Sequence, residues 1–129
     1  MADAVTSQTL YDGTRNAIMK FTNISDGTGE AAVLKVDAST LVGAPTEVSI
    51  YKIEYSTQGM LVNLLWDATT DVLAFSLPTD MTDTLEFAQL GGIWNNAGAG
   101  KTGDINITTV NHSLNDTYSI VLHLVKKFT

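Results

Sequence analysis

The sequence contains no cysteine, few basic residues and no long apolar run. The absence of cysteine excludes disulfide frameworks, thiolate metal sites and cysteine nucleophiles, and it fits synthesis in a reducing compartment. Seven Lys and Arg stand against fourteen Asp and Glu, which gives a formal net charge of −7. Because nucleic-acid affinity comes mostly from basic side chains that displace counterions from phosphates, we expect no nucleic-acid partner.

The hydropathy of the chain also argues against membrane insertion and secretion. No apolar stretch approaches the roughly 20 residues that a bilayer-spanning helix needs, so we expect no membrane partner. Residues 1–4 are polar and acidic rather than basic and then apolar, so no signal peptide is expected. The length of 129 residues fits a single domain over residues 1–129, in which the polar segment 1–9 is a candidate N-terminal arm.

The chain has instead an apolar pattern of period two. Apolar side chains alternate from Met60 to Trp66 and again from Tyr118 to Leu124, which predicts strands with one apolar face. Shorter segments with the same alternation are Ala17/Met19/Phe21, Ala32/Leu34/Val36, Leu73/Phe75/Leu77, Leu85/Phe87 and Ile105/Ile107.

The segment 46–55 changes phase, because Val48 and Ile50 share one face whereas Tyr51, Ile53 and Tyr55 share the other. A β-bulge or a strand that crosses between sheets explains such a slip. Turn-forming residues separate the strands, and at most a short helical turn is expected, near residues 79–83. We therefore predict an all-β fold, an antiparallel two-sheet β-sandwich, jelly-roll-like, with eight or nine strands.

Motifs that carry catalysis are incomplete. Gly100-Lys101-Thr102 resembles the end of a phosphate-binding loop, but Asn95 stands where that motif needs glycine, and a strand pattern follows instead of a helix. The only histidines, His112 and His123, lack the spacing of a metal site or a hydrolytic triad. Most acidic residues fall in turn signals, although spacing alone leaves a glycosidase pair open. We expect no catalytic residue, no metal, no cofactor and no enzymatic activity.

One glycine-rich stretch, residues 91–100, interrupts the strand pattern and contains Trp94. A tryptophan beside asparagines can stack on a sugar, anchor a protein interface or fold back onto the sandwich, and the sequence leaves these three interpretations open. The candidate protein-interface loop consists of Gly92, Ile93, Trp94, Asn95 and Asn96.

Several segments along the chain resemble a recurrent family of small virion proteins of tailed bacteriophages. The resemblance spans nearly the whole chain and is carried by residues 19–30, Lys35-Val36-Asp37, Leu65-Trp66-Asp67-Ala68-Thr69, residues 91–100 and Asp116-Thr117-Tyr118-Ser119-Ile120. The family has no catalytic motif, so no functional residue is transferred from it.

The resemblance implies a capsid decoration (cement) protein that is made in the host cytoplasm, lies on the capsid surface of the virion and stabilises the assembled lattice. The partner implied is the major capsid protein, together with self-association, for which a trimer is one arrangement. Two alternatives stay open: a subunit associated with the tail, neck or fibre, and a carbohydrate-binding module that uses the Trp94 loop.

Overall fold

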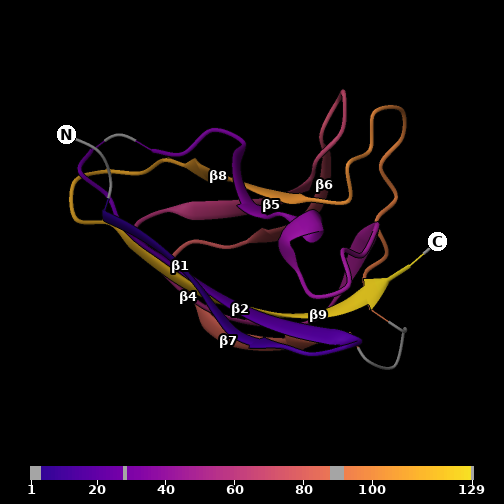
Figure 1. The fold of residues 1–129 in the computed structure, drawn as a ribbon. Helices are drawn as coiled ribbons and strands as arrows, with labels where there is room; N and C mark the ends of the chain where they lie inside the picture. Colours follow the sequence, from indigo (N-terminus) through magenta and orange to yellow (C-terminus); the bar gives the residue numbers. More distant parts are fainter. Residues whose placement is uncertain (1–3, 28, 88–91, 129) are drawn as a thin grey trace.

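The computed structural model describes residues 4–27, 29–87 and 92–128, and within them nine β-strands form two antiparallel sheets (Figure 1). One sheet has the strand order β1-β2-β9-β4-β7 and the other has the order β3-β8-β5-β6. The strands are β1 (Ala4–Asp12), β2 (Asn16–Ile24), β3 (Val33–Val36), β4 (Glu47–Gln58), β5 (Leu61–Trp66), β6 (Val72–Leu77), β7 (Thr82–Glu86), β8 (Ile105–Val110) and β9 (Thr117–Lys127).

The connectivity is that of a jelly roll. From β2 onward the chain passes between the two sheets at every connection except the β5–β6 hairpin, so that four strands β2-β9-β4-β7 face four strands β3-β8-β5-β6. This order is the double-sheet arrangement in which each sheet covers the apolar face of the other. The strand β1 extends the first sheet beyond β2. The predicted two-sheet antiparallel β-sandwich is therefore confirmed, with nine strands.

The core lies between the sheets and consists of the side chains that the period-two pattern places on one face. Val62, Leu64 and Trp66 of β5 are fully buried, and on β9 Ile120 and Leu122 are buried opposite them. The hydrophobic cluster includes residues of both sheets, so burial of apolar area is the main term that holds the two layers together.

A β-bulge in β4 accounts for the phase change in the sequence. The pairing of β4 with β9 slips between Ile50 and Lys52, which gives β4 one residue more than its partner at this point. Ile50 and Ile53 are consequently both buried in the core, and Tyr51 is only partly buried. The predicted bulge is confirmed.

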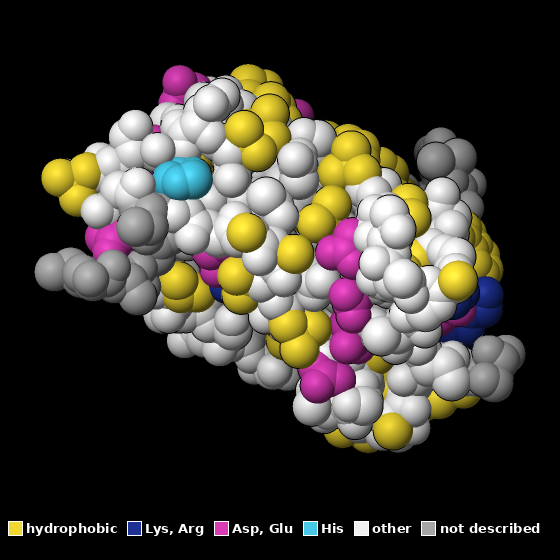
Figure 2. Space-filling model, turned by 90° about the horizontal axis from the view of Figure 1, so that it is seen from above, with side chains coloured by type: hydrophobic (Ala, Val, Ile, Leu, Met, Phe, Trp, Pro, Cys, Tyr) yellow, Lys and Arg dark blue, Asp and Glu magenta, His cyan; other side chains and the backbone are white. Residues whose placement is uncertain are grey.

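Two apolar residues that the alternation assigned to inward faces lie on the outer side of the four-stranded sheet. The pairing of β3 with β8 slips between Leu34 and Val36, so Val36 is buried whereas Leu34 is 50% exposed. The pairing of β5 with β6 slips in the same way, and Leu73 is 52% exposed. Figure 2, which looks onto this sheet from outside, shows hydrophobic side chains over its surface.

The structure also bears on two local expectations. The segment 79–83 forms no helical turn, because β7 begins at Thr82; the short helix of the structure is a single 3-10 turn at Ala38–Thr40, capped by Asp37. Residues 4–9 of the expected arm belong to β1, which pairs with β2, and residues 1–3 lie outside the described residues. Among the described residues no helix has the length and apolarity required to cross a membrane.

Two leucines on neighbouring strands test this assignment of faces. We expect Leu64→Ala, which empties a fully buried position, to lower the free energy of unfolding by about 2–5 kcal/mol. Leu73→Ala on the outer face should change it by less than about 0.5 kcal/mol. Urea unfolding of both variants measures the difference, and equal losses would contradict the outward position of Leu73.

Candidate interaction surfaces

The loop that contains Trp94 is attached to the sheet by its backbone. Ile93 and Ile50 exchange both of their backbone hydrogen bonds, at 3.1 and 2.6 Å, so the loop runs along the part of β4 that β7 does not pair. Gly92 has a φ of +97°, and a Cβ added there would lie 3.2 Å from the carbonyl oxygen of Ile50. Glycine is required at this position because both the left-handed backbone and the close approach disfavour a side chain.

Trp94 points away from the core. The alternation along the extended segment leaves Ile93 and Asn95 partly or fully buried and Trp94 53% exposed. The ammonium of Lys127, at the end of β9, lies 4.3 Å from the centre of the Trp94 ring, which is a cation–π contact. The structure therefore decides against a tryptophan folded into the sandwich and leaves an exposed aromatic side chain.

The two asparagines beside Trp94 differ in exposure. Asn95 is buried, and its Oδ1 accepts a hydrogen bond from the backbone of Ala97 at 3.0 Å, which stabilises the turn. No hydrogen-bond partner for Asn95 Nδ2 is present among the described residues. Asn96 is exposed. Of the five predicted interface residues, Trp94 and Asn96 thus have exposed side chains, while Gly92 and Asn95 are buried and Ile93 is partly buried.

A buried lysine, Lys126, lies next to Lys127 and joins β9 to two loops. The side chain of Lys126 is fully buried, and its ammonium donates to Asp12 Oδ1 and to the carbonyl oxygens of Gly13 and Val42. These partners come from the β1–β2 turn and from the loop before β4, so one cation joins three segments that are distant in sequence. The sequence did not indicate this role, because a lysine beside Lys127 is typical of the solvated end of a strand.

Asp12 is the anionic partner in this cluster. Burial opposes its ionisation, but hydrogen bonds from Lys126 and from the backbone of Val42, together with the charge of Lys126, hold the pKa of Asp12 below its ordinary value of 3.8. Asp12 therefore stays ionised at neutral pH, and its ion pair with Lys126 stabilises the fold there.

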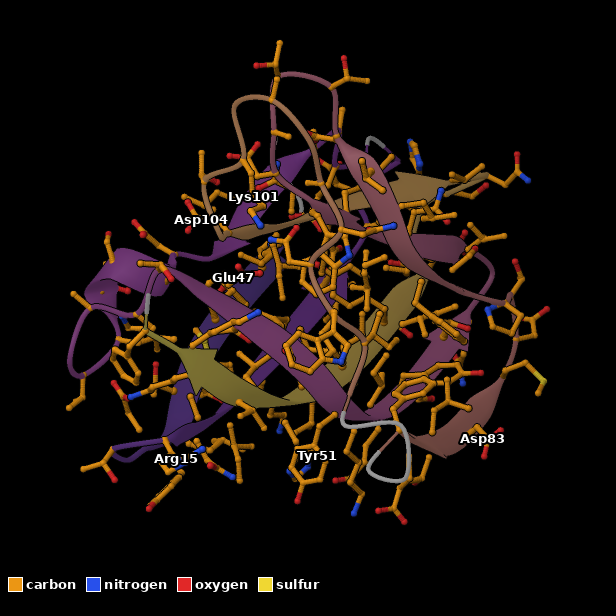
Figure 3. All side chains as sticks on the ribbon, turned by 90° about the vertical axis from the view of Figure 1, so that its right-hand side faces the viewer. Arg15, Glu47, Tyr51, Asp83, Lys101 and Asp104 are labelled. Carbon is orange, nitrogen blue, oxygen red and sulfur yellow. The ribbon has the colours of Figure 1, made fainter. Side chains whose placement is uncertain are left out.

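The segment that resembles a phosphate-binding loop has a structural role. Lys101 forms an ion pair with Glu47 at 3.3 Å, and Figure 3 shows both side chains at the end of the sandwich where β4 begins. The strand β8 follows at Ile105, so this segment opens no helix whose N-terminus could bind a phosphate.

The two histidines lie in separate places. His123 Nε2 lies 2.8 Å from Glu54 Oε1, and its ring meets the edge of Tyr51 at 6.4 Å between ring centres. His112 lies in the turn before β9, with Nδ1 3.4 Å from Thr109 Oγ1. No group of three or more His, Cys, Asp or Glu side chains within the described ranges is arranged to hold a metal ion.

A second buried ion pair lies between the sheets. Lys35 Nζ lies 2.6 Å from Glu30 Oε2, and Glu30 Oε1 accepts hydrogen bonds from Asn23 and Tyr118. Both charged side chains are almost fully buried, so each charge depends on the other for its stability. The cluster is enclosed, and both carboxylate oxygens of Glu30 are bound to protein groups, which is typical of a structural network.

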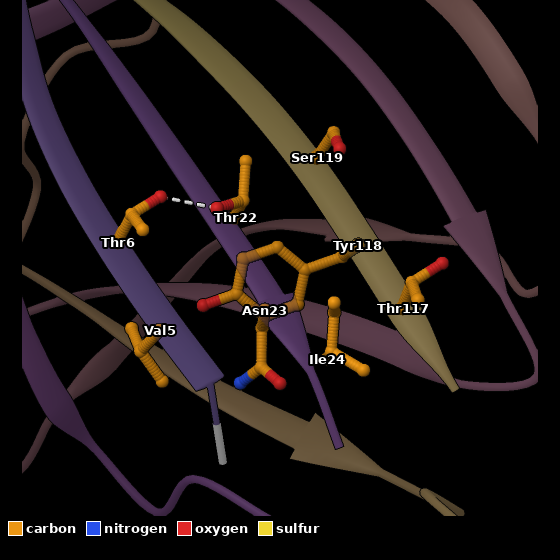
Figure 4. A pocket seen from close by; sticks show the side chains of 8 residues that line it. All are labelled: Val5, Thr6, Thr22, Asn23, Ile24, Thr117, Tyr118 and Ser119. Carbon is orange, nitrogen blue, oxygen red and sulfur yellow. Dashed lines mark hydrogen bonds between the residues drawn. The ribbon is translucent and has the colours of Figure 1, made fainter. Parts of the chain in front are cut away.

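A hollow of about 480 Å³ lies beside this network, at the ends of β1, β2 and β9 (Figure 4). Its lining consists of Val, Ile, Thr, Ser, Asn and Tyr side chains, among them Val5, Thr22 and Tyr118. None of the described residues that line it carries a carboxylate or imidazole side chain.

Comparison with known proteins adds little to this description. No protein-family model matches the chain, and no curated protein matches it. Among solved structures, the chain is similar to a cupin superfamily protein from Desulfitobacterium hafniense, with 14% sequence identity over 98% of this chain and 81% of that chain. The TM-score is 0.34, and no function is carried over from this similarity.

The exposure of Trp94 is measurable by fluorescence, because Trp66 is fully buried and is the only other tryptophan. We expect iodide to quench a large part of the emission of the native protein and to quench Trp94→Phe hardly at all. The nearby Lys127 should favour the approach of the anion. If iodide quenches the emission of Trp94→Phe as strongly as that of the native protein, Trp66 is not buried and the assignment of Trp94 as the exposed tryptophan is wrong.

The ion pair between Asp12 and Lys126 should make stability depend on pH. Because the pKa of Asp12 is lowered on folding, its contribution is present above its unfolded pKa and is lost as the pH falls through its folded pKa. We expect Asp12→Asn to lower the free energy of unfolding by about 1–3 kcal/mol at neutral pH and by much less at about pH 3. Urea unfolding midpoints measured between about pH 3 and pH 7 test this pH dependence. The control is Glu86→Gln on the exposed edge strand β7, whose effect on stability should not change with pH in this way.

Proposed function

We propose that this chain is a non-enzymatic structural protein of a bacteriophage virion, a decoration (cement) protein that binds the outer surface of the assembled capsid and stabilises it. The observation that carries the proposal is the Trp94 loop, in which an exposed aromatic side chain is held in place by backbone hydrogen bonds to β4. Tryptophan is enriched among the residues that dominate the energy of protein interfaces, and a preformed loop loses little entropy on binding.

Two further features support this role. The segments that resemble phage virion proteins include the whole Trp94 loop, and the two buried ion pairs, Lys126 with Asp12 and Lys35 with Glu30, are structural contacts. A subunit of this kind acts through its surfaces: it folds alone, stays soluble through its negative charge and adds to a finished shell.

The physical mechanism is the thermodynamic linkage between binding of this protein and assembly of the capsid lattice. A subunit that touches two neighbouring capsid proteins binds only where both are present, so its binding free energy is added to the stability of the assembled lattice. If the copies also associate with one another, for example as trimers, linked contacts raise the avidity further. The shell should then withstand heat and internal pressure better with the protein than without it.

The test uses capsids prepared with and without the protein. We expect added protein to raise the temperature at which empty shells disrupt, and Trp94→Ala to weaken its binding to shells by about tenfold or more. Leu114→Ala, an exposed apolar residue in the turn at the other end of β9, is the matched control and should bind normally.

The copy number separates the shell from other places in the particle. Hundreds of copies per virion support capsid decoration, whereas about six or twelve would assign the chain to the tail, neck or fibre. Shells that resist heat equally with and without the protein, and that show no added density on the lattice, would refute the decoration role.

A carbohydrate-binding module is the second candidate, because Trp94 and Asn96 are both exposed, two positions apart, and Lys127 lies near the indole ring. An exposed indole face and an amide are groups that stack on and hydrogen-bond to sugars. A glycan array distinguishes the two functions: binding that disappears in Trp94→Ala supports the module, and the absence of binding to every glycan removes it.

A further inference from the structure

The outer face of the four-stranded sheet carries leucines in a lateral row. Leu34 of β3 pairs with Asn106 of β8, Asn106 pairs with Leu65 of β5, and Leu65 pairs with Leu73 of β6. Paired residues of an antiparallel sheet point to the same side, so these four side chains cross the whole sheet on its outer face. We call Leu34, Leu65 and Leu73, together with Asn106, the leucine row.

A solvent-facing side of an antiparallel sheet is normally polar. Here Leu34 and Leu73 are about half exposed, and a further apolar pair, Leu61 with Val110, lies on the same face nearer the opposite end of β5. Neither half-exposed leucine is needed to cover the core, which lies on the other side of the sheet. Leu65 and Leu73 are direct neighbours, whereas Asn106, which is 5% exposed, lies between Leu65 and Leu34. Apolar side chains grouped on an exposed face are typical of a surface that binds another protein.

Four carboxylates lie beside the leucine row. Asp67 follows Leu65 by two positions and Asp104 precedes Asn106 by two, so both share the outer face, and their backbones are joined by the hydrogen bond from Asp67 N to Asp104 O at 3.0 Å. Asn106 Nδ2 donates to Asp67 at 3.0 Å and to Asp71 at 3.3 Å.

The fourth carboxylate, Asp37, lies where β3 ends, next to Ala38, whose backbone donates to Asp104 Oδ1 at 2.9 Å. We call Asp37, Asp67, Asp71 and Asp104 the aspartate row. Figure 2 shows acidic side chains aligned across this face beside hydrophobic ones.

The aspartate row is a concentration of negative charge without a cation. No Lys, Arg or His in the described part of the chain forms an ion pair with any of its four members. Burial, and then the charges of Asp37 and Asp67, raise the pKa of Asp104 above its ordinary value, although hydrogen bonds from Ala38 and Thr102 oppose the shift. A positive charge brought to this row would relieve the repulsion.

We propose that the leucine row and the aspartate row together form a docking surface for a second protein, one that presents an apolar stripe beside lysine or arginine side chains. The leucines supply the apolar contact, and the aspartates select a basic partner and fix its orientation. This surface lies on the opposite layer of the sandwich from β4 and the Trp94 loop, and the inference does not depend on whether the partner belongs to a capsid.

A second copy of this chain does not fit the same surface. The molecule carries a net charge of −7, and two copies joined through this face would bury both aspartate rows with no cation between them. Buried carboxylates that lack a positive partner cost several kcal/mol each, so self-pairing here is disfavoured. Charge complementarity therefore favours a basic partner.

The test titrates the full-length protein with a synthetic peptide in which leucine and lysine alternate, followed by amide chemical shifts in NMR spectra. We expect the largest shifts at Leu34, Leu65, Leu73 and Asn106. A peptide with the same leucines and glutamate in place of lysine should bind far more weakly. The double variant Asp67→Asn/Asp71→Asn should weaken binding of the lysine peptide by roughly three- to thirtyfold, and added salt should reduce the difference.

The matched control removes the same amount of charge from the other sheet. Asp83→Asn/Glu86→Gln changes two exposed carboxylates of β7 and should leave the affinity for the lysine peptide unchanged. Equal losses in the two double variants would show that only net charge matters, and shifts that map outside the leucine row would place binding elsewhere. Either result overturns the proposal.

One further variant separates a basic partner from a second copy. Leu73→Ser, on a half-exposed position, should reduce peptide binding while the protein stays folded by circular dichroism. If the protein alone dimerises and Leu73→Ser abolishes the dimer, the face is a self-association surface and the proposed partner is wrong.

Discussion

Two sheets that each have an apolar face can remove it from water only by covering it with the other sheet, and the positions of all other groups follow from that requirement. The inner faces of β5 and β9 meet in the core. The loops must then span from one layer to the other, and they place the Trp94 loop along β4 and the aspartate row where β5 ends and β8 begins. Both surfaces are attached to strands that cannot shift without exposing the core.

Strict alternation made most of this fold predictable from the sequence. In β5 every second side chain is apolar and buried, and in β9 the same holds from Tyr118 to Leu124, so neither strand has a competing register. The bulge in β4 was also predictable, because one extra residue in a strand shifts the apolar phase by one position and leaves that shift visible in the sequence. Leu34 and Leu73 were assigned wrongly, because the slips in β3 and β6 arise from pairing with β8 and β5 and leave no mark in the local pattern.

The side-chain clusters could be predicted from the sequence even less well than the strand slips. Lys126 with Asp12 and Lys35 with Glu30 are joined only after distant segments have been brought together, so neither pair has a sequence signature. Trp94 was identifiable as unusual because of the glycines around it, but its outward direction depends on the bridge between Ile93 and Ile50. The residue type identified Trp94 as a candidate, but the pairing between Ile93 and Ile50 determines that its side chain faces the solvent.

The place of β9 between β2 and β4 has a consequence for how the molecule reaches its native state. Residues of β2 pair with residues of β9 that lie about a hundred positions later, so the larger sheet cannot close around its centre until β9 has been synthesised. Topologies dominated by such distant pairings fold in milliseconds to seconds rather than microseconds. During that interval the edges of β2 and β4 that β9 will cover are unpaired, and unpaired strand edges are the places where partly folded chains associate with one another.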